Sequence, residues 1–498
     1  MGSCQALRGA AVLLSAALLC VATSDATATA QAPKPNFVFV LTDDLSRNLV
    51  PYMEHVQAMQ RQGTSFDRYV VTDSLCCPSR ASIFTGRYPH STGVITNQPP
   101  DGGFEVFHPV EEKSTFATSL QAEGYRTAMM GKYLNGYTPA GLVEGAPRFV
   151  PPGWSAWAVA GNGYGEFNYN LLVKRPGDTQ ARIVSYGDRP RDYLTDVISR
   201  RGQRFIAGAV QANQPFMLEL STFAPHGPFT PAPRDADKFP NARVPRGPLF
   251  NAAQLKDPPA WLPTEPLTEP QIADLDRNFR KRAQSVQAVD KMIGDIRAKL
   301  RDLGVAQNTY IVFTSDNGFH MGQRRLFQGK QTYFDHDVRV PMVVVGPDVP
   351  AGATVERLAA NVDLRPTFQE LAGAPIGPRV EGRSLAGFLR GQAVGNWRNV
   401  TLIEHNGPNA AAEDPDGQDA RQGNPPTYAA LRFPNALWVQ YDNAATAPEY
   451  YDMARDPLQR RNIAASLTPQ RRAELSALLA RMRACSGGAS CQKADQSQ

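Results

Sequence analysis

Short apolar runs rich in Val, Ile and Phe are the feature that most restricts how this chain can fold. Four of them read as buried strands, over residues 37–41, 216–220, 310–313 and 342–345. Continuous apolar runs of this length are typical of parallel strands covered on both faces. Helical patterns lie between them, and the clearest runs from about Pro270 to Leu303. Thr268 can cap the start of this helix and Gly304 can end it. The alternation predicts an α/β fold with a mostly parallel central sheet sandwiched by helices.

The C-terminal part of the chain differs in composition and in its pattern of predicted elements. Residues 406–427 are rich in Gly, Asn, Asp, Pro and Ala and predict a long loop. Strand-like stretches follow at 428–432 and 437–441, and a helix is predicted from Thr468-Pro469 to Arg483. The 498 residues suffice for one large core and a smaller domain. We therefore expect a main domain over residues 31–391 and an α+β subdomain over residues 392–498.

The first thirty residues are typical of a secretory signal peptide. Arg8 supplies a positive charge, the run from Ala10 to Ala22 is apolar, and Ala28-Thr29-Ala30 offers a cleavage site. The apolar run is too short to span a bilayer comfortably, although a short membrane anchor is the alternative. No later segment reads as transmembrane. The sequence therefore predicts export to a secreted or periplasmic location, without stable membrane insertion.

The net charge of the chain says little about its partners. A formal charge of +5 is too mild to indicate nucleic acid, and we predict no nucleic-acid partner. This charge is compatible with an anionic substrate, but solvated surface Lys and Arg explain it equally well.

Four cysteines remain once the predicted leader is removed. Cys485 and Cys491 lie close together near the C-terminus, and in an exported protein they are candidates for a local disulfide. Cys76 and Cys77 are adjacent to each other. Taken alone, that pair could form a vicinal disulfide or remain as two buried thiols.

Polar residues follow the first three predicted strands. Asp43-Asp44 follows the first strand, Pro225-His226 the second and Asp316-Asn317 the third. Ligands of open α/β sheets bind beyond the carboxyl ends of the strands, so we expect these side chains to converge. Asp43, Asp44, Asp316 and Asn317 offer oxygen donors that suit a hard cation such as Ca²⁺ or Mg²⁺. Each pair taken alone could also be a cap or a turn.

One segment resembles the signature of a known enzyme family. Cys76-Cys77-Pro78-Ser79-Arg80, followed by Thr85-Gly86-Arg87, is similar to the C-x-P-S-R and T-G-R segments of the sulfatases. The resemblance implies an alkaline-phosphatase-like core. It also implies that a separate formylglycine-generating enzyme converts Cys76 to formylglycine, with Arg80 holding the product. Cys77 occupies the variable position.

The implied modification explains how sulfate would be released. Hydrated formylglycine carries two hydroxyls, of which one attacks sulfur to give a covalent sulfo-enzyme. The second hydroxyl loses its proton, the aldehyde re-forms and sulfate leaves. The family's metal ligands fall on the four oxygen donors named above together with the modified Cys76. The cation would lower the pKa of the diol and neutralise sulfate oxygens.

Three further residues match sulfatase active-site positions. Lys132, in Gly131-Lys132-Tyr133-Leu134-Asn135, matches the first lysine, His226 the general acid or base, and Lys330 the second lysine. Positive groups suit the charge that builds on sulfate and on the leaving oxygen. Many sulfatases carry a histidine at the position of Leu134. We expect Asn135 to contact substrate in its place and His320 to line the rim of the pocket.

The G-K-Y-L-N form resembles the glucosamine-6-sulfatase and extracellular heparan-sulfatase subgroup. We therefore predict a calcium-dependent sulfuric ester hydrolase that acts on a sulfated sugar or an aryl sulfate. We expect its specificity to lie in loops such as 140–190 and 406–427. One alternative is a phosphate or phosphonate ester hydrolase with the same cradle. The other is a sulfated-glycan-binding protein without turnover, which would follow if Cys76 were never modified.

Overall fold

A ten-stranded sheet forms the centre of the computed structural model. Its five middle strands are mutually parallel, namely β11 (Thr309–Ser315), β1 (Asn36–Thr42), β10 (Phe216–Ser221), β4 (Arg126–Lys132) and β7 (Ala156–Ala160). The outer strands are β15 (Ala353–Val355), β2 (Thr64–Phe66) and β14 (Met342–Val345) on one side, and β8 (Asn170–Lys174) and β9 (Arg182–Ser185) on the other. The order is β15-β2-β14-β11-β1-β10-β4-β7-β8-β9. The predicted α/β fold with a mostly parallel sheet is confirmed.

The structure describes residues 1–2, 33–143, 146–408 and 414–496, and Lys34–Gln498 forms one compact unit. The predicted signal peptide over residues 1–30 therefore lies almost wholly outside the described residues. None of the helices in the described ranges has the length and apolar character needed to cross a bilayer.

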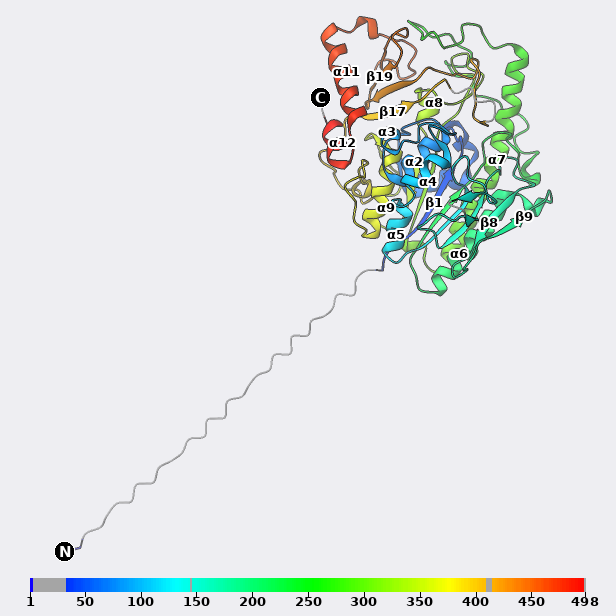
Figure 1. The fold of residues 1–498 in the computed structure, drawn as a ribbon. Coiled ribbons are helices and arrows are strands. Elements are labelled where there is room, and N and C mark those ends of the chain that lie inside the picture. Colours follow the sequence, from blue (N-terminus) through cyan, green and yellow to red (C-terminus); the bar gives the residue numbers. More distant parts are fainter. Residues whose placement is uncertain (3–32, 144–145, 409–413, 497–498) are drawn as a thin grey trace. The chain divides into compact units, whose positions relative to one another are not determined.

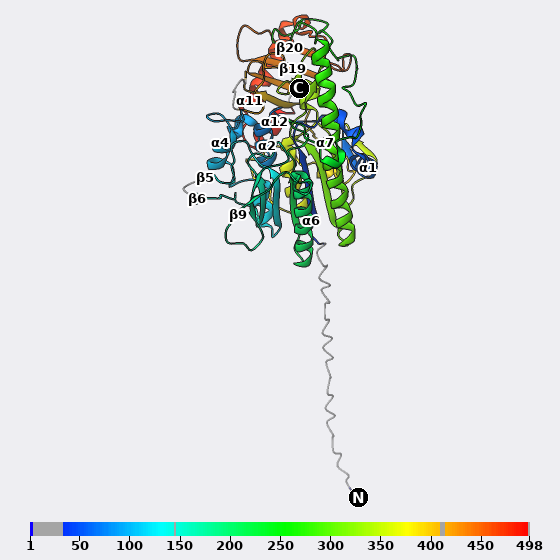
Figure 2. The ribbon, with the colours of Figure 1, turned by 90° about the vertical axis from the view of Figure 1, so that its right-hand side faces the viewer.

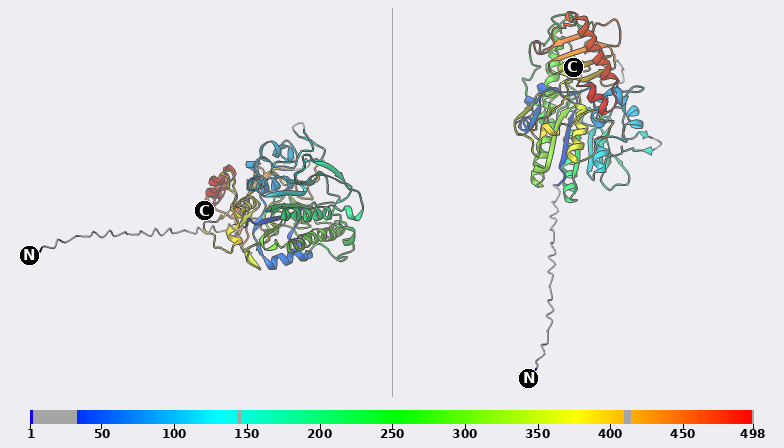
Figure 3. Two further views of the ribbon diagram at one scale, coloured as in Figure 1. Left: turned by 90° about the horizontal axis from the view of Figure 1, so that it is seen from below. Right: turned by 90° about the vertical axis from the view of Figure 1, so that its left-hand side faces the viewer.

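Both faces of the sheet are covered by helices. Phe37, Phe39 and Leu41 of β1 face one hydrophobic core, and Val38 and Val40 face another, as the two-residue period of a strand requires. The first core includes side chains of α2 (Cys76–Thr85), α5 (Phe116–Ala122) and α9 (Leu364–Ala372). The second includes side chains of α1 (Glu54–Gln62), α6 (Leu194–Gln211) and α7 (Glu269–Asp302). Figures 2 and 3 show α6 and α7 lying alongside each other.

The long helix α7 confirms the prediction for residues 270–303. The Thr268 hydroxyl accepts a hydrogen bond from the Gln271 backbone N–H, and the Gln271 side chain returns to the Thr268 backbone. This capping box satisfies N–H groups that the first turn of a helix leaves without partners. Gly304, with φ +71°, follows the last turn in the left-handed region.

The direction of one predicted strand is wrong. We expected residues 342–345 to form a parallel strand, but β14 runs antiparallel to β11 and β2. A parallel neighbour requires a long crossover to the far end of the sheet. The chain from Asp316 to Pro341 instead forms only the short elements β12 (His320–Met321), β13 (Gln328–Gly329) and α8 (Asp335–Val338). It therefore re-enters the sheet from the end at which β11 left it.

A separate antiparallel sheet forms the C-terminal part of the chain (Figure 1). Its strands are β17 (Thr401–His405), β18 (Tyr428–Arg432), β19 (Ala436–Tyr441) and β20 (Glu449–Asp452). The predicted strands at 428–432 and 437–441 are β18 and β19. The helix predicted at 468–483 is α11 (Pro469–Ala484), capped by Thr468. No strand or helix lies in the described part of the predicted loop, residues 406–408 and 414–427.

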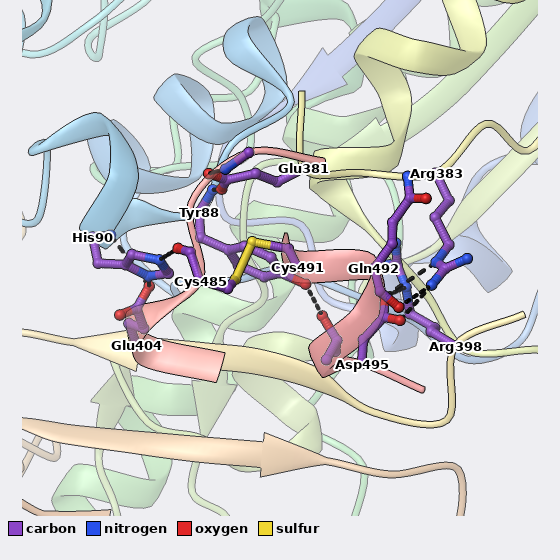
Figure 4. The surroundings of a disulfide bond; sticks show 12 residues. Tyr88, His90, Glu381, Arg383, Arg398, Glu404, Cys485, Cys491, Gln492 and Asp495 are labelled. Carbon is purple, nitrogen blue, oxygen red and sulfur yellow. Dashed lines mark hydrogen bonds and ion pairs between the residues drawn. A yellow bond between two sulfur atoms is a disulfide. The ribbon is translucent and has the colours of Figure 1, made fainter. Parts of the chain in front are cut away.

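The predicted disulfide joins Cys485, after α11, to Cys491 in α12 (Gly488–Ala494) (Figure 4). Nearby ion pairs hold the same tail. Arg383 pairs with Asp495, and His90 Nδ1 lies 2.8 Å from Glu404 Oε2. His90 Nε2 lies 2.9 Å from the Cys485 carbonyl. The disulfide and these pairs fix the C-terminal tail.

The remaining α-helices and strands of the described ranges are short. They are β3 (Tyr69–Val70), α3 (Pro89–Thr92), α4 (Gly103–Val110), β5 (Leu142–Val143), β6 (Ala146–Pro147), β16 (Ala359–Ala360) and α10 (Ala386–Leu389).

The middle strand β10 carries a carboxyl group in the core. Glu219 is fully buried, and neither of its carboxylate oxygens has a hydrogen-bond partner. It points to the same side of the sheet as Ser221, two residues along, whose hydroxyl contacts Arg80. Burial raises the pKa of Glu219 to about 8, although the Arg80 charge opposes that rise. Glu219 therefore binds a proton more tightly in the folded chain than in the unfolded chain.

This burial predicts a pH-dependent effect of Glu219→Gln on stability. A raised folded-state pKa means that wild-type stability falls as pH rises from the ordinary value of 4.5 to about 8. The glutamine stays neutral, so the variant should gain about 1–3 kcal/mol over wild type between pH 5 and pH 8.5. Denaturant unfolding at both pH values measures this gain.

The exposed Glu265→Gln is the matched control. Its side chain lies in solvent in the folded and unfolded chain alike, so we expect no such gain. If the unfolding free energies of wild type and Glu219→Gln differed by the same amount at pH 5 and pH 8.5, the raised pKa of Glu219 would be contradicted.

Candidate active site

The predicted polar residues lie together at the carboxyl end of the parallel strands. Asp43 and Asp44 follow β1, Asp316 and Asn317 follow β11, and Lys132 ends β4. The Asp44 backbone N–H donates to Asp316 Oδ1 at 3.2 Å, which joins the ends of β1 and β11. Asp44 has φ +64°, an uncommon conformation for a residue with a side chain. The strand ends therefore supply one compact polar cluster.

Cys76 opens helix α2 in the middle of this cluster. Its Sγ lies 3.2 Å from Asp43 Oδ1 and 3.0 Å from Lys330 Nζ. Cys76 and Cys77 are both free and buried, so the two do not form a vicinal disulfide. Burial, reinforced by the negative charges of Asp416 and Asp43, raises the pKa of the Cys76 thiol well above its usual value.

Arg80, one turn further along α2, ties the helix to three strands. Its Nε donates to Asp316 Oδ2 at 2.8 Å, and both side chains are completely buried. Its Nη1 donates to Ser221 Oγ at 2.6 Å and to the Lys132 carbonyl at 3.1 Å. Burial raises the pKa of Asp316 to about 6, and the charge of Asp43 adds to this rise while Arg80 opposes it.

Two buried lysines pair with aspartates of the cluster. Lys132 Nζ lies 2.6 Å from Asp43 Oδ2, and Lys330 Nζ lies 2.7 Å from Asp44 Oδ1. Burial would lower the pKa of Lys132, but the charge of Asp43 outweighs it and raises that pKa well above its usual value. The pKa of Lys330 is likewise raised, because the charges of Asp416 and Asp44 outweigh the effect of burial. Both lysines are therefore positively charged beside Cys76.

Gly131 allows β4 to bring Lys132 to this position. Gly131 has φ +110°, and a Cβ placed on it would lie 1.8 Å from the Ser221 carbonyl oxygen of β10. A residue with a side chain would push the two strands apart, so only glycine permits the close approach.

His226 lies five residues beyond the end of β10 and belongs to the same cluster. Its Nε2 is 3.7 Å from Asp44 Oδ2, and its ring centre is 4.5 Å from that of Tyr164. Burial lowers the pKa of His226, but Asp44, Asp43 and Asp416 outweigh it and raise the pKa to about 9.

Asp416 is a central residue of the cluster that the sequence reasoning missed. Its Oδ1 lies 2.7 Å from His226 Nε2 and 2.7 Å from Lys330 Nζ, and its Oδ2 lies 3.4 Å from Cys76 Sγ. It comes from the 406–427 loop that we expected to shape specificity. Two aspartates around a proline, at 414–416, were a visible signal, but no strand end placed them near the site.

Four of these side chains are arranged as a metal site could be. One ligand atom from each of Asp43, Asp44, Cys76 and His226 lies within 4.8 Å of the others, and all four residues are buried. The predicted ligand Asn317 lies beside them, with its Nδ2 2.6 Å from Asp44 Oδ1. Asn317 Oδ1 is buried without a hydrogen-bond partner. The predicted ligand Asp316 is engaged through Oδ2 by Arg80.

The two predicted substrate-binding residues have different surroundings. Asn135 is 8% exposed, lines a cavity of about 330 Å³, and its Oδ1 has no hydrogen-bond partner. Both ring nitrogens of His320 are engaged within the protein. Nδ1 lies 2.9 Å from Asp337 Oδ2, and Nε2 lies 2.7 Å from the Gln422 carbonyl. The role expected of His320 at the pocket rim stays a prediction.

Comparison with known proteins gives consistent family matches. Residues 35–374 match the sulfatase family, and residues 322–484 match the C-terminal region of N-sulphoglucosamine sulphohydrolase. The human N-acetylglucosamine-6-sulfatase is 33% identical over 481 residues, which cover 91% of this chain and 85% of that protein. The extracellular sulfatase SULF-1 homolog of Drosophila melanogaster is 34% identical over 77% of this chain and 34% of its own length.

A solved structure shares the fold. That neighbour, whose structure was solved in complex with its substrate D-glucosamine-2-N,6-O-disulfate, superposes on this chain with a TM-score of 0.72. The match covers 90% of this chain and 97% of the other at 22% identity. The alkaline-phosphatase-like architecture expected from the sequence is confirmed.

The contacts of Asn97 generate a testable prediction. Asn97 Oδ1 accepts from the Cys77 backbone N–H at 2.9 Å, and its Nδ2 donates to Asp416 Oδ2 at 2.8 Å. Asn97→Ala would leave both buried groups without this partner, so unfolding free energy should fall by about 1–3 kcal/mol. The exposed Asn170→Ala should change it by less than about 0.5 kcal/mol. Equal unfolding free energies of the two variants in denaturant would show that the hydrogen bonds of Asn97 to Cys77 and Asp416 do not stabilise the fold.

Proposed function

The chain belongs to the sulfatase family of sulfuric ester hydrolases, and we propose that it releases sulfate from a sulfated amino sugar through a formylglycine formed from Cys76. One observation carries this proposal. Cys76 opens a buried helix at the point where Lys132, Lys330 and His226 converge from separate strand ends. Positively charged side chains around one modifiable residue suit the transfer of a sulfuryl group from an anionic ester.

The modified residue would act in place of the thiol. A formylglycine-generating enzyme, with an oxidant such as dioxygen, would replace the sulfur of Cys76 by an aldehyde oxygen. The hydrated aldehyde supplies two hydroxyls on one carbon, one to attack sulfur and the other to expel sulfate as the aldehyde re-forms. Arg80 stands one turn away on the same helix, held by Asp316, and would keep position 76 in register with the strand ends.

The two lysines and the histidine would stabilise charge and move protons. Lys132 and Lys330 would bind the sulfate oxygens, because both carry buried positive charge beside Cys76. His226 would protonate the leaving sugar oxygen, since its Nε2 faces the site and its raised pKa keeps it protonated near neutral pH. Asp416 orients this imidazole from 2.7 Å.

The donor set fits a hard divalent cation, and we propose Ca²⁺, with Mg²⁺ as the alternative. Asp43, Asp44, Asp316 and Asn317 would hold it together with the oxygen of the modified Cys76. Asn317 Oδ1, a buried oxygen without a partner, supports this assignment. When bound, the cation would acidify a coordinated hydroxyl and neutralise sulfate charge.

The relatives guide the choice of substrate and location. The human relative is an N-acetylglucosamine-6-sulfatase and is similar over 91% of this chain, which supports a sulfated hexosamine as substrate. We also propose that the protein is exported and acts as a secreted or periplasmic enzyme. An extracellular relative and the Cys485–Cys491 disulfide support this location.

Substitution of the nucleophile tests the proposed reaction. Cys76→Ala should lower kcat for release of sulfate from N-acetylglucosamine 6-sulfate by at least about 10³-fold, because no aldehyde can form. The matched control is Cys77→Ala, which alters the neighbouring buried thiol and should keep most of the activity. Thermal unfolding verifies that both variants are folded. Turnover by folded Cys76→Ala would exclude the proposed nucleophile.

Metal removal and return test the cation. A chelated sample should lose sulfatase activity and melt at a lower temperature than the same sample supplied with CaCl₂ or MgCl₂. An ion at about a hundred times its dissociation constant stabilises the fold by about 3 kcal/mol. Asp44→Asn should remove most of the shift. If neither ion changes the melting temperature of the chelated wild type, the proposed metal site is wrong.

A further inference from the structure

A second cavity, of about 530 Å³, lies between helix α6 and the strands β4, β7 and β8. Arg126, which lines it, is the first residue of β4, whereas Lys132 of the catalytic cluster is the last. At about 3.3 Å per residue, the strand places these two residues about 20 Å apart. Lys174 also lines the cavity and pairs with Trp157, near the start of β7. The positive charges on these strands therefore lie at the end of the sheet opposite to the catalytic cluster.

Small side chains on β7 leave this space beneath α6. Ala156 and Ala158 belong to the same hydrophobic core as Met130, Val173 and Phe205, and all five line the cavity. Two residues apart on one strand, the alanines face the same side of the sheet, where α6 packs. Longer side chains at these two positions would fill the volume. The inner wall of the cavity is therefore apolar.

The charge around the cavity is entirely positive. Its lining, all of it within the described ranges, contains no Asp or Glu and five cations, namely Arg126, Lys174, Arg175, Arg201 and Arg204. Among the residues that the structure describes, none of the five forms an ion pair with a carboxylate. Asp178 lies outside the lining, and its Oδ2 accepts from the Arg175 backbone N–H at 2.9 Å. The cations of the cavity are therefore not neutralised by acids of its wall.

Contacts within the protein hold two of these arginines in place. Arg126 Nη1 donates to the Gly208 carbonyl of α6 at 2.7 Å, and Arg201 Nη2 donates to the Tyr186 hydroxyl at 2.8 Å. Arg201 Nε is buried and has no hydrogen-bond partner. Arg204 lies three residues further along α6, on the same side of the helix. Partial burial lowers the pKa of Arg204, and the like charge of Arg201 adds to this effect.

The side chains of the lining select a ligand by charge. None of the lining residues, which are all described, is Asn, Gln, Ser, Thr or Tyr, so sugar hydroxyls would find no neutral polar side chain there. Guanidinium groups bind tetrahedral oxyanions through pairs of parallel N–H donors. One such anion cannot contact cations that are spread over two strands and a helix. The arrangement therefore suits a ligand that carries several sulfate or phosphate groups.

We propose that this cavity is a second anion-binding site, remote from the catalytic cluster, which holds sulfate groups of a multiply sulfated glycan chain. The choice of sulfate over phosphate rests on the proposed function, because an enzyme that cleaves sulfate esters meets sulfated chains. The positive charge of the cavity itself does not depend on that function.

Chemical protection of the cavity arginines tests the site directly. Phenylglyoxal modifies accessible arginines, and peptide masses measure the rate at each position. A heparin octasaccharide should slow the modification of Arg201 and Arg204 at least about fivefold, whereas inorganic sulfate or N-acetylglucosamine 6-sulfate at equal sulfate concentration should have little effect. The exposed Arg301 and Arg481 are controls in the same sample and should react at an unchanged rate. Protection of the cavity pair no greater than that of the controls overturns the proposal.

A pair of double variants with the same change in net charge tests the contribution of the cavity to binding. Arg201→Gln/Arg204→Gln should raise the dissociation constant of the octasaccharide about tenfold, as expected for two partly exposed ionic contacts. Arg301→Gln/Arg481→Gln should leave it within about twofold of wild type. Melting temperatures verify that both variants are folded. Equal dissociation constants for the two variants overturn the proposal.

Two further outcomes separate the parts of the account. Protection of Arg201 and Arg204 without sulfate release from any sugar would overturn the proposed function and support the second site. Sulfate release from the octasaccharide without this protection would overturn the second site alone. Equal protection by a DNA oligonucleotide of matched charge would overturn the choice of a sulfated chain as the ligand.

Discussion

The buried ion pair between Arg80 and Asp316 is the interaction on which the site geometry depends. It joins helix α2, which begins with Cys76, to the end of the parallel strand β11. The same guanidinium reaches Ser221 in β10 and the Lys132 carbonyl in β4. Breaking a buried pair by removing one partner typically costs about 3–5 kcal/mol, because the other charge is left uncompensated. One side chain thus fixes the helix that begins with Cys76 relative to three strands of the sheet.

The charges around Cys76 explain why this arrangement needs so many partners. Asp43, Asp44 and Asp416 surround Lys132, Lys330 and His226, and all six residues are buried. Each charge is tolerated there only because an opposite charge or a hydrogen bond is close. A divalent cation and a sulfate ester would enter as one further opposite pair. This balance of charges suits the proposed pairing of an anionic sulfate ester with a divalent cation.

The sequence predicted those parts of the molecule that local chemistry determines. The apolar runs at β1, β10 and β11 carry strand signals that are independent of their surroundings, and the polar residues after them converge because parallel strands end at one edge. The capping residues Thr268 and Thr468 marked the starts of α7 and α11 for the same local reason.

The features that were missed depend on tertiary structure. Strand β4 contains Ala128 and two methionines in place of β-branched residues, so its strand signal is weak, and only its packing between β10 and β7 defines it. The direction of β14 depends on the path of the chain between 316 and 341. Asp416 reaches the site from a loop nearly two hundred residues after His226, a closeness that no local pattern encodes.

The central claim is that Cys76 acts as an aldehyde, and the mass of one peptide tests it most directly. Trypsin releases Tyr69–Arg80 from the active, reduced and alkylated protein. The account predicts that position 76 has lost its sulfur and two hydrogens and gained one oxygen, while Cys77 carries a single alkyl group. A peptide from fully active enzyme in which both Cys76 and Cys77 are alkylated would contradict it.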